Sequence, residues 1–290
     1  MQLEDLVRAE LTTPVQREVA AFAAVIAARL PGTNAVLFYG SCLREARLDG
    51  LMLDFYVIVD DYTRAYCGGW RAMVNRLIPP NVFQIAHEDL RAKYAVLNSA
   101  DFARLCSSKT HNPSVWARFA QPSRLAWVRD DAARDAAVAA VSGAAPALLG
   151  AAVPILPAGS SVEVLWTGAF ALTFAAELRT ERAGRGSSIF AADPERYQAF
   201  TAPALAATGP MLAPAAAARA WRRRRFEGKL LSLTRLAKAA FTFDGGLDYL
   251  AWKIERHAGM PVPVKGWQRR WPLLGGLALL PRLLRLGAVR

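Results

Sequence analysis

The stretch YGSCLREARLDGLMLDFYVIVDD, residues Tyr39 to Asp61, decides the fold. It begins at the end of one short apolar run, Asn34–Tyr39, and contains a second, Leu51–Val59. Apolar runs of this length, bounded by glycine, serine and aspartate, are typical of buried strands. The stretch therefore predicts two buried strands, with a tight turn at Gly40-Ser41 directly after the first.

The polar residues of this stretch are suited to phosphate and metal binding. Gly40 lets a phosphate approach the backbone, and the Ser41 hydroxyl and the N–H groups of the turn can donate to it. Asp54 lies among apolar residues, where a carboxylate is costly unless it is at a strand end, paired or bound to a metal. The arrangement resembles polymerase-β-like nucleotidyltransferases, in which such a turn holds a triphosphate and paired carboxylates hold Mg²⁺. Ordinary turn chemistry with a capped aspartate is the alternative interpretation.

The second carboxylate of such a site is not obvious in the sequence. The usual Asp-x-Asp pair is absent, because Met52 stands at its first position. Asp60 follows Asp54 by six residues, roughly 20 Å along a straight strand, which is too far to share one metal ion. Asp49 is the better candidate for a second ligand, because a loop can bring it back toward Asp54.

The charge is concentrated at the C-terminal end of the chain. The sequence has 36 Lys and Arg against 24 Asp and Glu, a net charge of +12. Residues 1–200 are balanced, and residues 201–290 hold 16 basic and four acidic residues. This asymmetry predicts an anionic partner, either nucleic acid or an acidic membrane surface. Two segments are suited to contact lipid phosphates: the basic run Trp221–Phe226 and the leucine- and arginine-rich tail Trp271–Arg290. The alternative is a solvated helix for the basic run and a terminal helix docked on the core for the tail.

The rest of the chain predicts mainly helices. The uncharged stretch Ala136–Val162 is broken by three prolines, which favours helix, loop and turn over a membrane span. The N-terminus has no signal-peptide pattern, and three cysteines without a CxxC motif fit a reducing, cytoplasmic setting. Further expected elements are helices over Gln2–Leu30, Asp61–Leu77, Ala132–Gly150, Val162–Arg179, Asp193–Phe200, Ala215–Ala240 and Asp244–His257, a hairpin of Val82–Ala86 with Ala92–Leu97, and a linker over Pro203–Pro214.

Several dispersed motifs resemble the mitochondrial-type phosphatidate cytidylyltransferases, the translocator-assembly-and-maintenance family of CDP-diacylglycerol synthases. Departures from the family pattern include Cys42 in place of a glycine, a short segment between Asp61 and Pro80, and a glycine displaced to Gly245-Gly246. The matching motifs are Tyr39-Gly40-Ser41, Met52-Leu53-Asp54-Phe55 with Val59-Asp60-Asp61, Val82-Phe83 with Lys93-Tyr94 and Val96, Trp116–Pro122, and Lys238 with Phe241-Thr242.

This resemblance implies an α+β protein that transfers CMP from CTP to phosphatidic acid. It implies a polymerase-β-like nucleotidyltransferase domain over residues 1–110, a mostly helical, winged-helix-like domain over 111–202 and a basic, membrane-associating region over 203–290. The enzyme is then expected to be peripheral to the inner face of the membrane, with nucleic acid a disfavoured partner.

The resemblance also implies a role for each site residue. Asp54 and Lys93 are the predicted catalytic residues, with Asp54 and Asp49 as Mg²⁺ ligands. Gly40, Ser41 and Arg118 are predicted to bind the nucleotide, and Lys238 the lipid phosphate. Because a phosphate monoester already carries nearly two negative charges, it can attack without a dedicated base. For Lys93 and Arg118, solvated or ion-paired surface residues are the alternative.

Two other functions stay open at the level of sequence. A nucleotidyltransferase could act on a soluble small molecule or on RNA instead of a lipid. The missing carboxylate pair also fits a degenerate, non-catalytic fold that binds membranes or nucleic acid.

Overall fold

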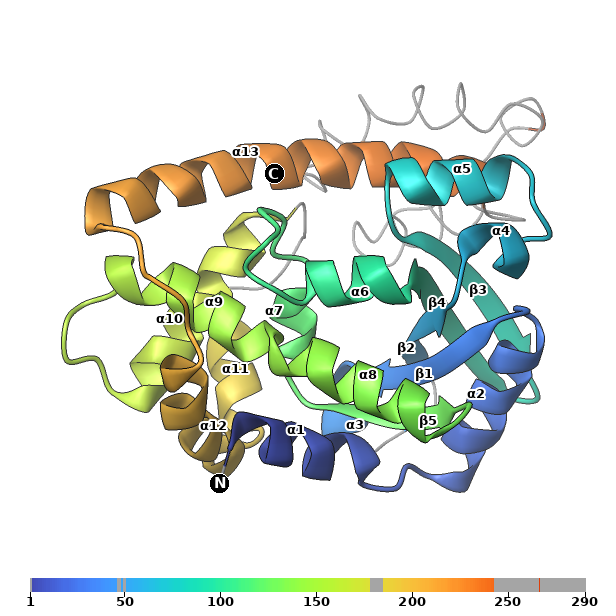
Figure 1. Ribbon diagram of the computed structural model, residues 1–290, viewed down its shortest axis with the longest axis horizontal. Coiled ribbons are helices and arrows are strands. Elements are labelled where there is room, and N and C mark those ends of the chain that lie inside the picture. Colours follow the sequence, from blue (N-terminus) through green and yellow to red (C-terminus); the bar gives the residue numbers. More distant parts are fainter. Residues whose placement is uncertain (1, 46–47, 49–50, 178–184, 243–265, 267–290) are drawn as a thin grey trace.

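A five-stranded mixed sheet lies at the centre of the computed structural model, with helices on both faces (Figure 1). The structure describes residues 2–45, 48, 51–177, 185–242 and 266. The strand order is β3-β4-β2-β1-β5, in which β2 and β4 are parallel and the other neighbours antiparallel. The strands are β1 (Thr33–Tyr39), β2 (Met52–Val59), β3 (Asn81–His87), β4 (Leu90–Asn98) and β5 (Ser123–Val128).

Helices make up most of the remaining described chain. Several begin at an acidic or amide cap, as where the Asp130 side chain accepts from the Ala133 N–H at the start of α8. The helices are α1 (Leu3–Thr12), α2 (Arg17–Ala28), α3 (Ser41–Glu45), α4 (Tyr62–Ala65), α5 (Trp70–Leu77), α6 (Ser99–Leu105), α7 (Trp116–Phe119), α8 (Asp131–Ser142), α9 (Ala144–Ala152), the 3-10 helix η1 (Val153–Ile155), α10 (Val162–Ala175), α11 (Arg185–Ala191), α12 (Pro194–Ala206) and α13 (Pro214–Thr242).

Alternation along the strands divides the core into two layers. On β2, Phe55 and Val57 pack with α2, whereas Tyr56 and Ile58 pack with α1, α6 and α7. Because successive side chains point to opposite faces, Asp54 lies on the same face as Tyr56. That face therefore combines a large apolar core with the carboxylate that the sequence singles out.

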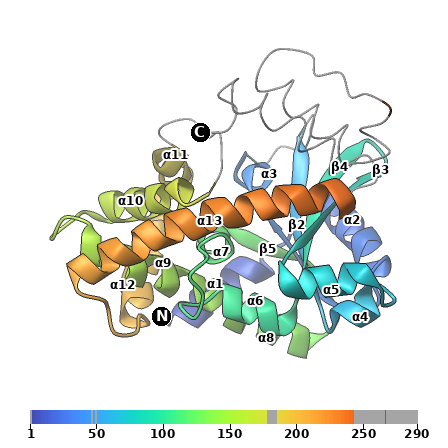
Figure 2. The same ribbon diagram turned by 90° about the horizontal axis from the view of Figure 1, so that it is seen from above.

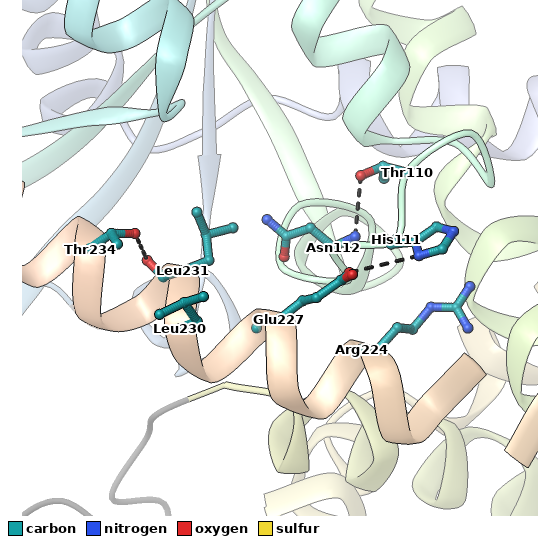
Figure 3. Close-up of a pocket in the computed structure, with 9 residues that line it drawn as sticks. Thr110, His111, Asn112, Arg224, Glu227, Leu230, Leu231 and Thr234 are labelled. Atoms are coloured by element: carbon teal, nitrogen blue, oxygen red, sulfur yellow. Dashed lines mark hydrogen bonds and ion pairs between the residues drawn. The ribbon is translucent and has the colours of Figure 1, made fainter. Parts of the chain in front are cut away.

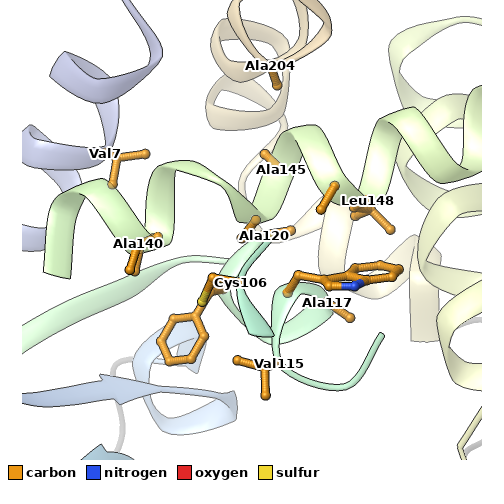
Figure 4. Packing of buried hydrophobic residues seen from close by; sticks show 14 of the residues in the cluster. Val7, Cys106, Val115, Ala117, Ala120, Ala140, Ala145, Leu148 and Ala204 are labelled. Carbon is orange, nitrogen blue, oxygen red and sulfur yellow. The ribbon is translucent and has the colours of Figure 1, made fainter. Parts of the chain in front are cut away.

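The alanine-rich middle of the chain packs against this second layer. Small side chains such as Ala140, Ala145 and Ala117 let α8, α9 and α7 approach closely around Cys106 and Leu148 (Figure 4). The helical stretch Asp131–Ile155 is long and apolar enough to cross a membrane, but 56% of its apolar window is buried inside the protein. It is interrupted at Gly143 and ends in η1 at Pro154, in agreement with the predicted helices and turn, but α9 runs through Pro146, which was predicted to break it.

Four predictions about the elements need correction. Strand β5 lies beyond residue 110, so the sheet continues into the segment predicted to be mostly helical. The described residues from Asp131 to Ala206 form helices and no strand, so a winged-helix-like form is not seen there. Helix α12 runs through Pro203, which shortens the predicted linker. The Asp61–Leu77 helix is broken between α4 and α5, where Gly68 and Gly69 have positive φ. The expected helix Asp244–His257 lies outside the described residues.

Helix α13 crosses one side of the molecule from the helical layer to the sheet (Figures 1 and 2). Near its N-terminal end, the Trp221 Nε1–H donates to the Ala151 carbonyl at 2.7 Å. Farther along, α13 packs on β3, beside α5. The predicted helix Ala215–Ala240 is thus confirmed.

Candidate active site

The turn after β1 lets a neighbouring group approach its backbone closely. Gly40 has φ +94°, a left-handed value that side chains rarely adopt, and Ser41 begins α3 immediately after it. A Cβ atom added at Gly40 would lie 2.7 Å from Asp54 Oδ2. The absence of a side chain at residue 40 therefore lets the Asp54 carboxylate lie directly against the turn.

Asp54 occupies the centre of a three-strand register. On β2 it faces Tyr39 of β1 on one side and Lys93 of β4 on the other. The Lys93 ammonium lies 2.9 Å from Asp54 Oδ1, and the aspartate side chain is only 16% exposed. The contact lacks hydrogen-bond geometry, so the buried Oδ1 atom has no hydrogen-bond partner in the structure. A largely buried carboxylate thus has one oxygen against the glycine turn and the other beside a single ammonium.

These features fit a metal ion that is held mainly by its substrate. Mg²⁺ is commonly bound by one or two carboxylates together with substrate phosphates. Asp54 Oδ1 lacks a hydrogen bond, and the missing side chain at Gly40 leaves the backbone of the turn directly beside Oδ2. Within the described residues no group of three His, Cys, Asp or Glu side chains could hold a metal. The predicted second ligand Asp49 lies outside the described residues, and its role stays a prediction.

Asp60 forms ion pairs away from Asp54, as its distance along the strand predicts. It lies beyond the other end of β2, where its Oδ2 atom contacts Arg64 at 3.3 Å and Arg129 at 3.2 Å. These contacts place Asp60 in an ion-pair network at the strand end remote from Gly40.

Arg118 lies near the same face of the sheet, in a buried ion pair. From α7 it reaches Glu177 Oε1 at 3.1 Å and donates to the Ser114 carbonyl. Burial by itself opposes the guanidinium charge, but Glu177, with smaller contributions from Tyr56 and Tyr39, outweighs it and raises the Arg118 pKa. Tyr56, two residues after Asp54, packs beside Tyr39 and Phe119. The nucleotide-binding role of Arg118 stays a prediction, for a residue whose charge is already partly neutralised.

Lys238 and Arg235 join α13 to the loop before β3. Lys238 donates to the carbonyls of Ile78 and Pro80, and Arg235 donates to the Pro79 carbonyl at 2.6 Å. Burial, with a smaller contribution from Arg235, lowers the Lys238 pKa to about 7. The described contacts of Lys238 are therefore with backbone, and its predicted contact with a lipid phosphate stays untested.

One polar residue at the site was not found from the sequence. Gln84 on β3 pairs in register with Lys93, which itself pairs with Asp54. The Gln84 Nε2 atom is buried and has no hydrogen-bond partner. The predicted hairpin around His87–Asp89 contained the necessary signal, because its register brings residue 84 opposite residue 93. Gln84 adds a second unsatisfied polar atom beside the Asp54–Lys93 pair.

A separate groove of about 430 Å³ lies between α13 and the loop at residues 110–112 (Figure 3). On its wall, His111 Nδ1 lies 3.7 Å from Glu227 Oε2. The groove shares no lining residue with the Asp54 site. It is lined by Thr110, His111, Asn112, Arg224, Glu227, Gly228, Leu230, Leu231 and Thr234.

Comparison with known proteins finds similarity among solved structures but none at the level of sequence. No family model and no curated protein matches the sequence, so the resemblance to the phosphatidate cytidylyltransferases depends on the quoted motifs alone. The structure is similar to the crystal structure of a nucleotidyltransferase-like protein from Exiguobacterium sibiricum, at 12% identity and a TM-score of 0.29. The similarity covers 94% of this chain and 92% of that one. A similarity this distant does not by itself assign a function.

Proposed function

We propose that the protein is a nucleotidyltransferase whose centre is the Gly40-Ser41 turn with Asp54 and Lys93. The observation that carries the proposal is the approach of the Asp54 carboxylate to a left-handed glycine turn, beside one ammonium on the next strand. Such a turn offers N–H groups to a triphosphate, and the Asp54 carboxylate lies against the same turn. A bound Mg²⁺ would neutralise the triphosphate there, with Asp54 as its protein ligand.

The reaction needs positioning more than proton transfer. An acceptor phosphate oxygen forms a bond to the α-phosphorus of the nucleotide, the bond to the bridging oxygen of the β-phosphate breaks, and pyrophosphate leaves. Ser41 and the turn would orient the triphosphate, and Lys93 would offer positive charge to its phosphates.

The specific substrates that we propose are CTP and phosphatidic acid. Support comes from the motifs that resemble the phosphatidate cytidylyltransferases, with Tyr39-Gly40-Ser41 and Met52–Phe55 falling at the centre of the site. Lys93, which belongs to a third motif, lies within ion-pair distance of Asp54. Three motifs that are separate in the sequence thus meet around one carboxylate.

The test is transfer of labelled CMP from CTP to phosphatidic acid dispersed in detergent with Mg²⁺. Asp54→Asn should lower the rate by about 10²-fold or more, because it removes a charge that acts on the phosphates through the metal. Asp135→Asn is the matched control, since Asp135 is an exposed carboxylate on α8 that pairs with Arg8. Binding of Mg²⁺-CTP without transfer would redirect the search to soluble or RNA acceptors. Absence of any nucleotide binding would overturn the proposal.

A non-catalytic binding role is the second candidate. The observation that favours it is the residue set around Asp54, where Met52 replaces one carboxylate of the usual pair and Lys93 stands 2.9 Å away. In that case the ammonium would neutralise Asp54 in place of a metal. Titration of the protein with CTP, with and without Mg²⁺, separates the two, because only the enzyme requires the metal for tight nucleotide binding.

A further inference from the structure

Large hydrophobic side chains are exposed mainly on two helices of this molecule. Six of the nine that the described residues expose lie on α5 and α13, so they are not scattered singly over the surface. On α5 they are Trp70, Met73 and Leu77, and on α13 they are Phe226, Leu230 and Leu233.

The exposed residues of α13 form one face of the helix. At 100° per residue, the three apolar residues and four exposed basic residues fall within an arc of about 120°. The opposite side of the helix is buried through Ala217 and Trp221, and Gly228 packs on the Ala176 carbonyl. The seven outward residues are Arg219, Arg222, Arg223, Phe226, Lys229, Leu230 and Leu233.

Helix α5, which lies on the same side of the molecule as α13, exposes a similar stripe. Trp70, Met73 and Leu77 recur at helical spacing, and Leu77 is 72% exposed. Both views place α5 beside the C-terminal part of α13 (Figures 1 and 2). The two helices are held together, because Lys238 and Arg235 of α13 bind the carbonyls of residues 78–80, directly after α5.

We infer that these outward residues, the two-helix face, dock the protein on a bilayer that contains anionic lipid. A membrane interface accepts both kinds of side chain, since cations contact lipid phosphates while apolar groups enter the acyl boundary. Tryptophan is enriched at that boundary, which suits Trp70. Helix α5 has no acidic residue, and the one acidic residue of α13, Glu227, lies outside the seven-residue arc, where it pairs with Arg223.

Other occupants fit this face less well. A second copy related by two-fold symmetry would bring the four cations of one α13 against those of the other. A nucleic acid would satisfy the cations but leave Leu77, Leu230 and Leu233 without apolar partners. The bilayer is therefore the occupant that the combination of charge and apolar surface favours.

The two-helix face would bring the proposed enzyme to the bilayer that contains its lipid acceptor. This step rests on the proposed function, which identifies that acceptor. Helix α13 lies close to the sheet face that carries the site, because Arg235 donates to the Ser114 hydroxyl at 3.1 Å and Arg118 donates to the Ser114 carbonyl. A bilayer on the outer side of α13 would thus hold the enzyme within about one helix diameter, 10 Å, of that layer. Transfer to a lipid in vesicles would then depend on the face, whereas transfer to detergent-dispersed lipid would not.

The test is flotation with vesicles of phosphatidylcholine alone or mixed with phosphatidylglycerol. The wild type should float only with the mixed vesicles. Leu77→Gln combined with Phe226→Gln, and separately Arg219→Gln combined with Arg222→Gln, should each weaken that binding by about tenfold or more. All four positions are exposed, so circular dichroism should show an unchanged fold.

Matched controls come from the same chain. Val164→Gln changes an exposed apolar residue of α10, and Arg17→Gln an exposed arginine of α2, and both should float as the wild type does. Flotation of the double variants at wild-type level would overturn the inference, as would a wild type that binds no vesicle. The inference would also be overturned if the double variants lost self-association or RNA binding while their flotation stayed unchanged. Flotation needs no catalysis, so its failure is distinguishable from failure of the detergent transfer assay.

Discussion

Replacing Gly40 by alanine tests the geometry on which the proposed function depends. The new Cβ would meet Asp54 Oδ2 at 2.7 Å in a backbone conformation with φ +94°. The left-handed backbone costs about 1–2 kcal/mol for a residue with a side chain. Displacing the carboxylate, which also contacts Lys93, adds about 1–3 kcal/mol of overpacking. Gly40→Ala should therefore lower the free energy of unfolding by about 2–5 kcal/mol.

A second glycine separates the two contributions. Gly159 has φ +72° and nothing within 4 Å of an added Cβ, so Gly159→Ala should cost only the backbone part, about 1–2 kcal/mol. In an Asp54→Ala background the nearest remaining neighbour of the Gly40 Cβ is the residue-54 Cβ, at 3.3 Å. Gly40→Ala should then cost about 1 kcal/mol less than it does in the wild type.

Urea unfolding of the four proteins in this cycle measures the coupling, and Mg²⁺-CTP titration measures the function. We expect Gly40→Ala to lose nucleotide binding, because the new side chain displaces the Asp54 carboxylate from its position against the turn. Gly159→Ala should bind nucleotide as the wild type does. Strict additivity of Gly40→Ala and Asp54→Ala, with a Gly40→Ala cost equal to that of Gly159→Ala, would refute the contact between the turn and the carboxylate.

Three further predictions concern buried groups. Glu177→Gln leaves the buried Arg118 charge without its carboxylate, so urea unfolding should show a loss of about 3 kcal/mol that Arg118→Met in the same chain partly reverses. Burial, followed by Arg235, lowers the Lys238 pKa in the folded protein to about 7, from the ordinary value of 10.5. Between these two pH values the unfolded chain binds one more proton than the folded protein, so the free energy of unfolding rises with pH. Lys238→Met should remove up to about 1.4 kcal/mol of that rise per pH unit, measured between about pH 7 and 9. Gly228→Ala would drive a Cβ into the Ala176 carbonyl and separate α13 from α10; a melting temperature equal to that of the wild type would contradict this close packing.

The strands β1 to β4 and the Gly40-Ser41 turn could be predicted because their signals are local. Each strand is an apolar run bounded by turn residues, and the hairpin has its polar turn in sequence. Strand β5 lacks such a signal, since it carries Ser123 and Arg124 and its side chains are mostly half-buried. It becomes a strand because β1 offers a free edge, which depends on tertiary pairing and not on periodicity.

The chemistry of the site was only partly predictable for a similar reason. Gly40, Ser41 and Asp54 follow from one stretch of sequence, and the structure brings Gly40 and Asp54 together. The contact of Lys93 with Asp54 needs the parallel pairing of β2 with β4, which no spacing within either strand encodes. Arg118 illustrates the limit, because its charge could be seen in the sequence but its partner Glu177, 59 residues away, could not.

The basic helix α13 shows why net charge alone overstates a binding surface. Four consecutive arginines suggest one strongly basic patch, yet a helix separates neighbours by 100°. Arg222 and Arg223 are exposed, whereas Arg224 lies over the Trp221 ring, with its guanidinium 5.2 Å from the ring centre. Farther along, Arg235 turns inward to backbone carbonyls. The inward cations stabilise the attachment of α13, and the outward Arg223 pairs with Glu227, so helical phase leaves fewer charges for the proposed anionic partner than the sequence suggests.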